Sequence, residues 1–329
     1  MISFENIVDR IKKSNNIAIF AHRFPDPDAC GSMFALKRFC QILGKHAEVF
    51  VPKRNPNYLD LIFPMNETRE DFHKSDFDLV IFVDMHLMMR IDKVFGEQTL
   101  NEIRSSNIVV IDHHNILEGE ELPTEDYFEE SVASCCQLIL RLYKTANIVP
   151  NKEVCTYLYA GLMGDTSRFL HTNLNRDVFE TAIYLQDHGA EIQKVYDYMY
   201  RYITKEQLRV EKYYLDNLKF IAGGRCAYVI FSKKTREELG VDIDDIKTLS
   251  NKIVMIKGVD LSFLIMEYLD GEYKFSLRCK DCCRVDEFCS KFGGGGHSYA
   301  AAFDLNITAD EIDAKIEPWA KEILNGKQA

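Results

Sequence analysis

The sequence IAIFAHRFPDPDACGS, residues 17–32, decides the fold. Its first residues form an apolar run, which predicts a short buried strand over residues 17–21. A helical pattern follows from about residue 29 to residue 43, and Gly44 supplies a stop signal. Between the two stand His22, Asp26 and Asp28, crowded where a buried strand ends. The question is whether the rest of the chain supplies partners for these three side chains.

Composition indicates an ordinary globular protein. The chain has 329 residues, of which 47% are hydrophobic and 28% charged, and this length suggests roughly two domains. No apolar run approaches the ~18 residues that span a bilayer. The start, MISFENIVDRIKKSNN, lacks the apolar core and cleavage site of a signal peptide. We therefore expect a cytoplasmic protein without a membrane partner.

The charge balance limits the choice of partners. The formal net charge is −11 and the pI about 5.4. Binding along a long duplex depends on many lysine and arginine contacts to phosphates, so we expect no long-duplex nucleic acid partner. A small anionic substrate remains compatible with this charge if metal ions supply positive charge in a local pocket.

The ten cysteines are expected to be reduced thiols in this compartment. The sequence CKDCC at 279–283 resembles half of a zinc site. A structural zinc site needs a second ligand pair at suitable spacing, and Cys289 alone does not provide one. The sequence therefore disfavours a zinc site.

The first part of the chain alternates strand-like runs with helical patterns. Further apolar runs occur at 47–51, 79–83 and 108–111, and further helical patterns at about 132–145, 152–163 and 176–188. Continuous apolar strands separated by helices are typical of a parallel sheet covered on both faces. We therefore predict an α/β domain over residues 1–190, with a mainly parallel sheet between helices.

The pattern changes after this domain. Residues 191–216 are charged and aromatic, which favours a helical connector. Residues 217–329 predict a smaller α+β domain with hairpins that turn at Gly223-Gly224 and at Asp270-Gly271. A helical pattern near 285–292 leads into the sequence GGGGH at 293–297.

Ligand-type residues end several predicted strands of the first domain. LVIFV (79–83) is followed by Asp84, and IVVI (108–111) by Asp112, His113 and His114, while Asp165 follows the apolar part of YLYAGLMGDTSRF (157–169). Sites in open parallel sheets form beyond the carboxyl ends of the strands. Four segments would therefore converge on one edge.

Such a cluster of carboxylates would repel itself unless a cation were bound. Imidazole and carboxylate ligands suit Mn²⁺, Fe²⁺, Co²⁺ or Zn²⁺. Five or six ligands suggest two ions that share a bridging carboxylate, a pair that can activate water for displacement at phosphorus. Taken singly, Asp28 could cap a helix beginning at Ala29, and His22 could be a hydrogen-bonded interior histidine. The conjunction favours a metal site.

Five motifs together resemble one family. HRFPDPDACGS, VDMHLMMR, IDHH, GLMGDTSRF and GGGGHSYAAAF occur in the order seen in the DHH phosphoesterase superfamily. The length and two-domain layout look like the nanoRNase or pAp phosphatase branch, with its C-terminal DHH-associated domain, and like cyclic-dinucleotide phosphodiesterases. The resemblance spans nearly the whole chain. Two departures are ASCC (133–136) in place of ASS and Ala302 in place of a glycine.

The resemblance implies a set of metal ligands and catalytic residues. One Mn²⁺ would be held by His22, Asp26 and Asp84. The other would be held by Asp28, Asp84, His113 and Asp165. Asp84 would bridge the two ions, for which Fe²⁺, Co²⁺ or Mg²⁺ could substitute. Asp112 would orient the cluster, and His114 would act beside the scissile phosphate.

The resemblance also implies a substrate handle in the second domain. Gly294, Gly295 and His297 would grip a terminal phosphate, and Arg278 would add a bidentate contact. Arg168 matches a family arginine that could touch phosphate. GGGGH lacks the Lys-Ser/Thr that completes a nucleoside triphosphate loop, so the sequence disfavours an ATPase.

The function that the resemblance implies is a Mn²⁺-dependent phosphodiesterase or phosphatase. Its substrates would be short oligoribonucleotides, dinucleotides or pAp, cleaved to nucleoside monophosphates by water that two metal ions activate. A homodimer is also implied. The first alternative is a cyclic-dinucleotide phosphodiesterase. A manganese inorganic pyrophosphatase is disfavoured because those enzymes lack the GGGGH loop, and a non-catalytic RNA or nucleotide binder because all six metal ligands are present.

Overall fold

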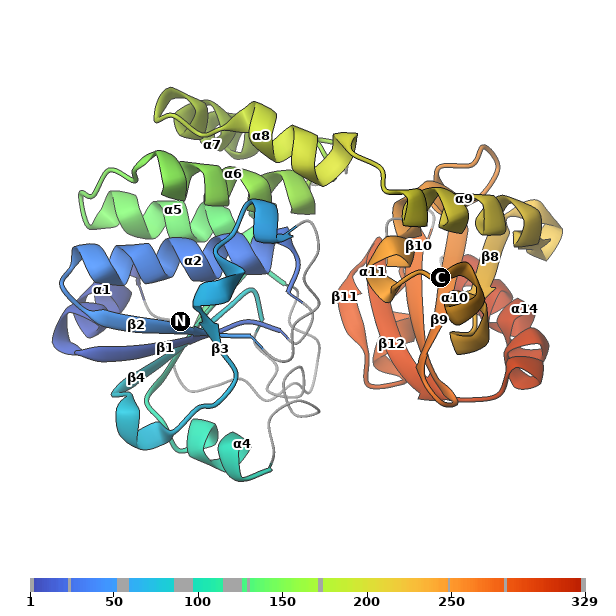
Figure 1. Cartoon of the computed structure of the whole chain (residues 1–329), viewed down its shortest axis with the longest axis horizontal. Helices are drawn as coiled ribbons and strands as arrows, with labels where there is room; N and C mark the ends of the chain where they lie inside the picture. The colour runs from blue at the N-terminus through green and yellow to red at the C-terminus, as the bar shows by residue number, and fades with distance from the viewer. Residues whose placement is uncertain are drawn as a thin grey trace. The chain divides into compact units, whose positions relative to one another are not determined.

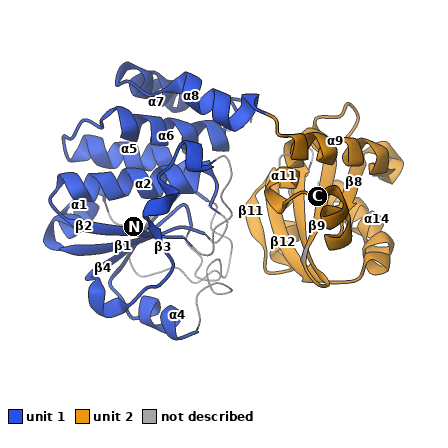
Figure 2. Cartoon of the chain, in the orientation of Figure 1, with its two compact units in different colours: residues 1–202 blue, residues 203–329 orange. Residues whose placement is uncertain are grey.

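The computed structural model of the chain describes residues 3–22, 25–51, 59–85, 97–114, 126–128, 131–170, 174–247, 249–280 and 283–326. It divides into two compact units, residues 1–202 and residues 203–329, drawn blue and orange in Figure 2. Each unit has its own sheet and its own apolar core. No helix among the described residues is long and apolar enough to cross a membrane.

The first unit is built on a sheet in which every neighbouring pair of strands is parallel. In spatial order the strands are β3 (Thr68–Arg69), β2 (His46–Phe50), β1 (Asn16–Phe20), β4 (Leu79–Val83), β5 (Ile108–Asp112) and β6 (Asp126–Phe128). The four strands predicted from apolar runs are confirmed, and so is their parallel arrangement. The strand order reverses at β1, because the chain adds β2 and β3 on one side and β4 to β6 on the other.

Helices cover both faces of this sheet (Figure 1). They are α1 (Phe4–Lys13), α2 (Pro27–Ile42), α4 (Glu97–Arg104), α5 (Cys135–Thr145), α6 (Lys152–Asp165), α7 (Arg176–Asp187) and α8 (Ile192–Tyr196), with a π-helical turn at Asp197–Arg201 and 3-10 turns at Leu59–Leu61, Met65–Glu67 and Lys74–Asp76. Alternate residues of β1 face the two layers. Ile17 and Ile19 pack in the core that includes α1, α2, α5 and α6, whereas Ala18 and Phe20 pack with residues of α4. Burial on both faces explains why the strands are continuously apolar.

The second unit contains a mixed sheet. Its strands lie in the order β11 (Gly295–His297), β12 (Ala300–Asn306), β10 (Glu272–Cys279), β9 (Leu261–Leu269), β8 (Cys226–Phe231) and β7 (Lys219–Ile221). Only the β8–β9 pair is parallel. The helices are α9 (Lys205–Asn217), α10 (Lys233–Leu239), α11 (Ile243–Lys247), α12 (Ser250–Val254), α13 (Asp286–Ser290) and α14 (Ala309–Asn325), with a 3-10 turn at Ala222–Gly224. Both predicted hairpins are present, and the predicted α+β class is confirmed.

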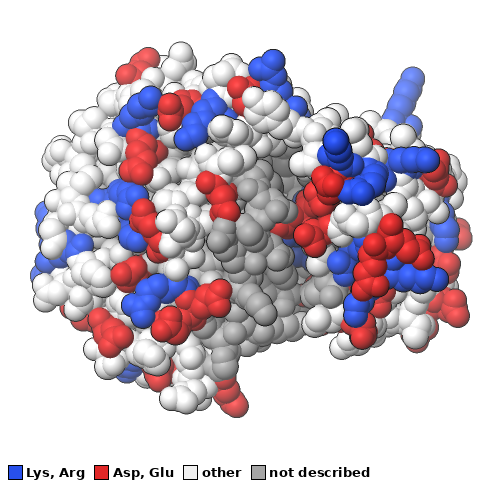
Figure 3. Space-filling view, viewed as in Figure 1, with Lys and Arg blue, Asp and Glu red and all other residues white. Residues whose placement is uncertain are grey.

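Charges of both signs are interspersed on the described residues of the face drawn in Figure 3. Elsewhere in the structure, too, exposed charges of opposite sign are paired, such as Lys152 with Glu191 at 2.9 Å and Lys321 with Glu317 at 2.9 Å. This face therefore lacks a continuous basic stripe among its described residues, in keeping with the net charge of −11.

Candidate functional site

The polar residues that follow β1, β4 and β5 meet at the carboxyl edge of the first sheet. This edge lies next to the point where the strand order reverses, which is where open α/β sheets place their sites. His22 follows β1, Asp84 follows β4 directly, and His113 follows β5. Asp28 comes from the first turn of α2, and Asp165 is the last residue of α6.

Asp28, Asp84, His113 and Asp165 form the first group of ligand-type side chains. Nε2 of His113 lies 3.1 Å from Oδ2 of Asp165, 3.3 Å from Oδ1 of Asp84 and 3.6 Å from Oδ2 of Asp28. One donor atom from each of the four residues lies within 4.8 Å of all the others. Three of these residues are almost fully buried, and Asp165 is partly exposed.

His22, Asp26 and Asp84 form the second group. Nε2 of His22 lies 3.5 Å from Oδ2 of Asp84 and 4.0 Å from Oδ2 of Asp26. Oδ1 of Asp84 thus faces His113 in the first group while its Oδ2 faces His22 in the second. A carboxylate in this position can bridge two cations.

The chemistry of the two donor sets fits divalent cations. The first set holds three carboxylates and one imidazole, and the second holds two carboxylates and one imidazole, with Asp84 in both. Such oxygen-rich sets with a histidine suit Mn²⁺, Fe²⁺ and related ions. The structure thus brings together all six predicted metal ligands in groups that could hold metal ions.

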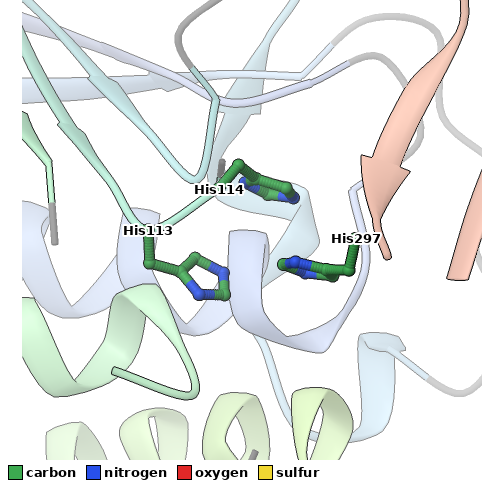
Figure 4. A group of neighbouring side chains, drawn as sticks. All are labelled: His113, His114 and His297. Carbon is green, nitrogen blue, oxygen red and sulfur yellow. The ribbon is translucent and has the colours of Figure 1, made fainter. Parts of the chain in front are cut away.

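Asp112 and His114 lie beside the first group. Nδ1 of His114 is 2.8 Å from Oδ1 of Asp112, and the same oxygen accepts the backbone N–H groups of His113 and His114. The rings of His113 and His114, which both follow β5, have centroids 4.8 Å apart (Figure 4). Asp112 therefore fixes the ring of His114 and the backbone that carries His113.

Asp28 is held by the first turn of α5. Oδ2 of Asp28 accepts the backbone N–H of Cys135 at 2.6 Å, and Oδ1 accepts that of Cys136 at 3.0 Å. A carboxylate at a helix N-terminus is favoured by the helix dipole. Sequence reasoning missed this contact, although the ASCC segment marks the start of α5.

The cap of α2 differs from the one considered in the sequence. Oδ1 of Asp26 accepts the N–H groups of Asp28 and Ala29, so Asp26 is the N-cap and the helix begins at Pro27. The alternative in which Asp28 caps a helix from Ala29 is wrong. A proline in the first turn explains the earlier start, because its fixed φ suits that position and its missing N–H is not needed there.

Burial and neighbouring charges shift the pKa values of this cluster. Burial raises the pKa of Asp28 well above its ordinary value, and the charges of Asp165 and Asp84 add to the rise. Burial likewise raises the pKa of Asp165 to about 6, although His113 opposes the change. For His113, burial lowers the pKa, but Asp165 and Asp84 outweigh burial and hold it well above its ordinary value. Without cations, the cluster therefore retains protons near neutral pH.

The backbone is strained on both sides of the site. Asp84 has a φ of 56°, in the left-handed region that residues with a Cβ avoid. After Asp165 and Thr166, three consecutive residues, Ser167, Arg168 and Phe169, have φ values of 46°, 64° and 60°. Strain of this kind clusters at functional sites.

The second unit contains the other predicted contacts. Arg278 of β10 and His297 of β11 both pair with Ala300 of β12, so the three residues form one row across the sheet and share a face. Nε of Arg278 donates to Oδ1 of Asn251 at 2.8 Å, and its Nη1 donates to the carbonyl of Leu277 at 2.8 Å. His297 is drawn in Figure 4.

Two glycines of the GGGGH sequence have a packing role. A Cβ on Gly294 would lie 2.2 Å from the carbonyl oxygen of Ala302, and one on Gly296 would lie 2.4 Å from that of Ala300. Gly295 pairs with Ala302 in the β11–β12 ladder. These glycines let the backbone approach β12 closely, a requirement that stands beside the predicted contact with phosphate.

None of the metal-ligand groups found among the described residues contains a cysteine. The nine cysteines in the described part of the chain are buried and form no disulfide. Sγ of Cys279 donates instead to the carbonyl of Cys283 at 3.1 Å. Cys282 lies outside the described residues.

Comparison with known proteins gives the class of protein that this fold and site belong to, the phosphoesterases. Residues 16–162 match the model of the DHH family, N-terminal domain. This match identifies residues 16–162 as a domain of the DHH family, as the motifs in the sequence indicated.

Curated relatives and solved structures extend the comparison to most of the chain. The chain is 27% identical over 307 residues to the "Bifunctional oligoribonuclease and PAP phosphatase NrnA" of Mycoplasma genitalium, covering 91% of each chain. It is 25% identical over 327 residues to the "Cyclic-di-AMP phosphodiesterase PdeA" of Listeria monocytogenes, covering 93% of this chain and 47% of that protein. Its fold is similar to that of an exopolyphosphatase-related protein from Bacteroides fragilis, with a TM-score of 0.84, 22% identity and coverage of 97% and 95% of the two chains.

Proposed function

We propose that the protein is a Mn²⁺-dependent phosphodiesterase and phosphatase that hydrolyses short oligoribonucleotides, dinucleotides or pAp to nucleoside monophosphates. The observation that carries this proposal is the position of Asp84, whose two oxygens face two separate ligand groups. The substrate class rests on the similarity to the relative named oligoribonuclease and PAP phosphatase, which extends over 91% of this chain.

The first step is to bind two cations at the strand ends. His22, Asp26 and Asp84 would hold one ion, and Asp28, Asp84, His113 and Asp165 the other. Bound there, the ions would lower the pKa of a water molecule and neutralise charge on the reacting phosphate.

His114 would transfer a proton in this scheme. Its Nδ1 is fixed by Asp112 at 2.8 Å, so the ring is oriented and its Nε2 is the nitrogen that points away from Asp112. Nε2 of His114 would donate a proton to the leaving oxygen, and Asp112 would stabilise the ring while it carries a positive charge. Exposed Arg168, on the turn after Asp165, would contact a phosphate oxygen with its guanidinium.

The second unit would supply a phosphate contact of its own. We propose that Arg278 and His297, in one row of the sheet across Ala300, grip a terminal phosphate together with the backbone of Gly294 and Gly295. Because alanine has the smallest side chain after glycine, it leaves room between the arginine and the histidine for an anion.

Product analysis tests the proposal. Purified protein with Mn²⁺ is incubated with 5′-phosphorylated RNA dinucleotides to pentanucleotides, pAp, cyclic di-AMP and pyrophosphate. We expect nucleoside monophosphates from short RNA and AMP from pAp, with Asp84→Asn inactive and depleted of metal. Asp187→Asn, which changes an exposed aspartate on α7 in the same way, is the matched control.

The panel also separates the alternatives. Turnover of cyclic di-AMP alone would favour the second candidate, a cyclic-dinucleotide phosphodiesterase, which is supported by the similarity to PdeA over 93% of this chain. Turnover of pyrophosphate alone, or an active Asp84→Asn variant that keeps its metal, would refute the proposal.

A further inference from the structure

The turn after α6 presents Arg168 in an unusual way. Ser167, Arg168 and Phe169 are all left-handed, although none is glycine. Two contacts of Phe169 anchor the turn. Its ring packs against that of Phe179 with centroids 5.7 Å apart, and its N–H donates to the hydroxyl of Thr166. Within this anchored turn Arg168 is the exposed, charged side chain.

The side chain of Arg168 lies over the ring of Tyr200. The guanidinium carbon of Arg168 lies 5.0 Å from the centroid of the Tyr200 ring, within the range of a cation–π contact. Among the described residues, no hydrogen bond or ion pair of the Arg168 side chain accompanies this contact. The ring of Tyr200 is therefore the surface against which the guanidinium is ordered.

One carbonyl group ties the tyrosine to the turn. The carbonyl of Met163 accepts both the backbone N–H of Arg168 at 3.0 Å and the hydroxyl of Tyr200 at 3.0 Å. Met163 lies two residues before Asp165 in α6, so the tyrosine, the arginine and a proposed metal ligand are joined through one helix end.

The position of Tyr200 in the chain supports a functional role. It lies in the π-helical turn Asp197–Arg201, closed by a bond from the N–H of Tyr202 to the carbonyl of Asp197. Single π-turns occur frequently at functional sites. Burial raises the pKa of the Tyr200 hydroxyl, Arg168 opposes the rise and Asp165 adds to it, so these charged groups act on the phenol from close by.

We propose that Tyr200 is a positioning residue for the phosphate-binding Arg168. Its ring holds the guanidinium beside the metal centre, and its hydroxyl fixes the ring to the end of α6. The inference rests on the proposed function, because it assigns to Arg168 a phosphate of the substrate or product. Tyr200 itself does not touch the reacting atoms in this scheme.

A double-mutant cycle tests the inference with AMP, the product expected from pAp. AMP binding to the Mn²⁺-loaded protein is measured by calorimetry for the wild type, Tyr200→Leu, Arg168→Ala and the double variant. Removing the ring should weaken AMP binding about 2- to 5-fold, the size of an exposed cation–π contact. In the Arg168→Ala background the same change should have no further effect, because the group it positions is gone.

Two further variants separate positioning from folding. Tyr200→Phe keeps the ring and loses only the bond to Met163, so it should bind AMP more tightly than Tyr200→Leu. Tyr202→Leu, at an exposed tyrosine in the same segment, should bind AMP as the wild type does. Mn²⁺ affinity should be unchanged in all of these variants, since neither tyrosine is among the grouped ligands.

The outcomes distinguish the inference from the proposed function. Equal AMP affinity in the wild type and Tyr200→Leu, or the same loss with and without Arg168, would overturn the positioning role alone. A wild-type protein that neither binds AMP nor hydrolyses any substrate would overturn the proposed function, and the inference with it.

Discussion

Gly161→Ala tests whether the packing of α6 against α2 and α5 sets the position of Asp28. A Cβ at residue 161 would lie 2.3 Å from Sγ of Cys136 and 2.8 Å from Oδ1 of Asp28. An ordinary carbon contact needs about 3.5 Å, so the neighbours must move by about 1.2 Å. The backbone of Asp28 takes part, with its Cα 3.0 Å away, and a change of rotamer cannot relieve that contact.

Two opposing effects set the change in the free energy of unfolding of Gly161→Ala. Overpacking of a buried junction costs about 1–3 kcal/mol, while alanine in a helix interior is favoured over glycine by about 1 kcal/mol. Because backbone is involved, we expect the upper end of the cost, and a net loss of about 2 kcal/mol in the free energy of unfolding. Displacement of Asp28 should also weaken the binding of one Mn²⁺ ion by about 10- to 100-fold, the usual effect of disturbing the support of a ligand.

Urea unfolding and calorimetric Mn²⁺ titration measure the two effects. Gly164→Ala is the matched control, because for the same change in the same helix the nearest atoms all belong to the ring of Pro27, with Cβ at 3.1 Å and Cγ at 3.3 Å. Adding Cys136→Ala to Gly161→Ala removes the contact with sulfur but not the one with Oδ1 of Asp28. We therefore expect the double variant to regain stability without regaining Mn²⁺ affinity. Wild-type stability and Mn²⁺ affinity in Gly161→Ala would refute this reasoning.

Three further predictions follow from the geometry. Binding of Mn²⁺ near neutral pH should release protons, because the pKa values of Asp28 and His113 are raised in the metal-free cluster. Titration in buffers of different ionisation enthalpy measures the release, and its absence would contradict these shifts. Metal-free protein should become more stable as the pH falls from about 7 to about 5, since the folded chain then binds protons that the unfolded chain does not, at Asp165 with its pKa of about 6 among others. A thermal unfolding midpoint that decreases as the pH is lowered over this range would contradict this prediction. Asn251→Ala should raise the KM for pAp about 3- to 10-fold at nearly unchanged kcat, because Arg278 loses the acceptor of its Nε–H; an unchanged KM, with Arg278→Ala as the reference, would show that Asn251 does not position the arginine.

The strand ends could be predicted because the signals are local. The runs before Asp84 and before Asp112 are continuous apolar segments, and parallel topology alone places their carboxyl ends at one edge. The structure adds which atoms face one another. Oδ1 and Oδ2 of Asp84 point to different groups from a backbone with a φ of 56°, and a pattern of residue types specifies neither the orientation nor the φ.

Contacts between distant segments could not be predicted in this way. The N–H groups of Cys135 and Cys136 meet Asp28 across more than a hundred residues of chain. Sequence periodicity indicates a helix near residue 135 but not what its N-terminus faces. The same holds for Tyr200, whose relation to Arg168 depends on where a π-turn sets the ring. In the GGGGH sequence, the motif that predicts a phosphate contact also contains Gly294 and Gly296, which a steric requirement against β12 explains by itself.

The left-handed backbone at Asp84 and the left-handed backbone at Arg168 have a common explanation. Each non-glycine residue in this conformation costs about 1–2 kcal/mol, so Asp84 and Arg168 together cost about 2–4 kcal/mol, a sizeable fraction of the stability of a typical domain. Glycine would adopt either conformation without that cost. The chain instead carries a carboxylate at one position and a guanidinium at the other. Packing of Phe169 and the bond from the N–H of Asp84 to the carbonyl of Ile111 hold the backbone in place, so the strain is tolerated at the two positions that the proposed function assigns to a metal ligand and to a phosphate contact.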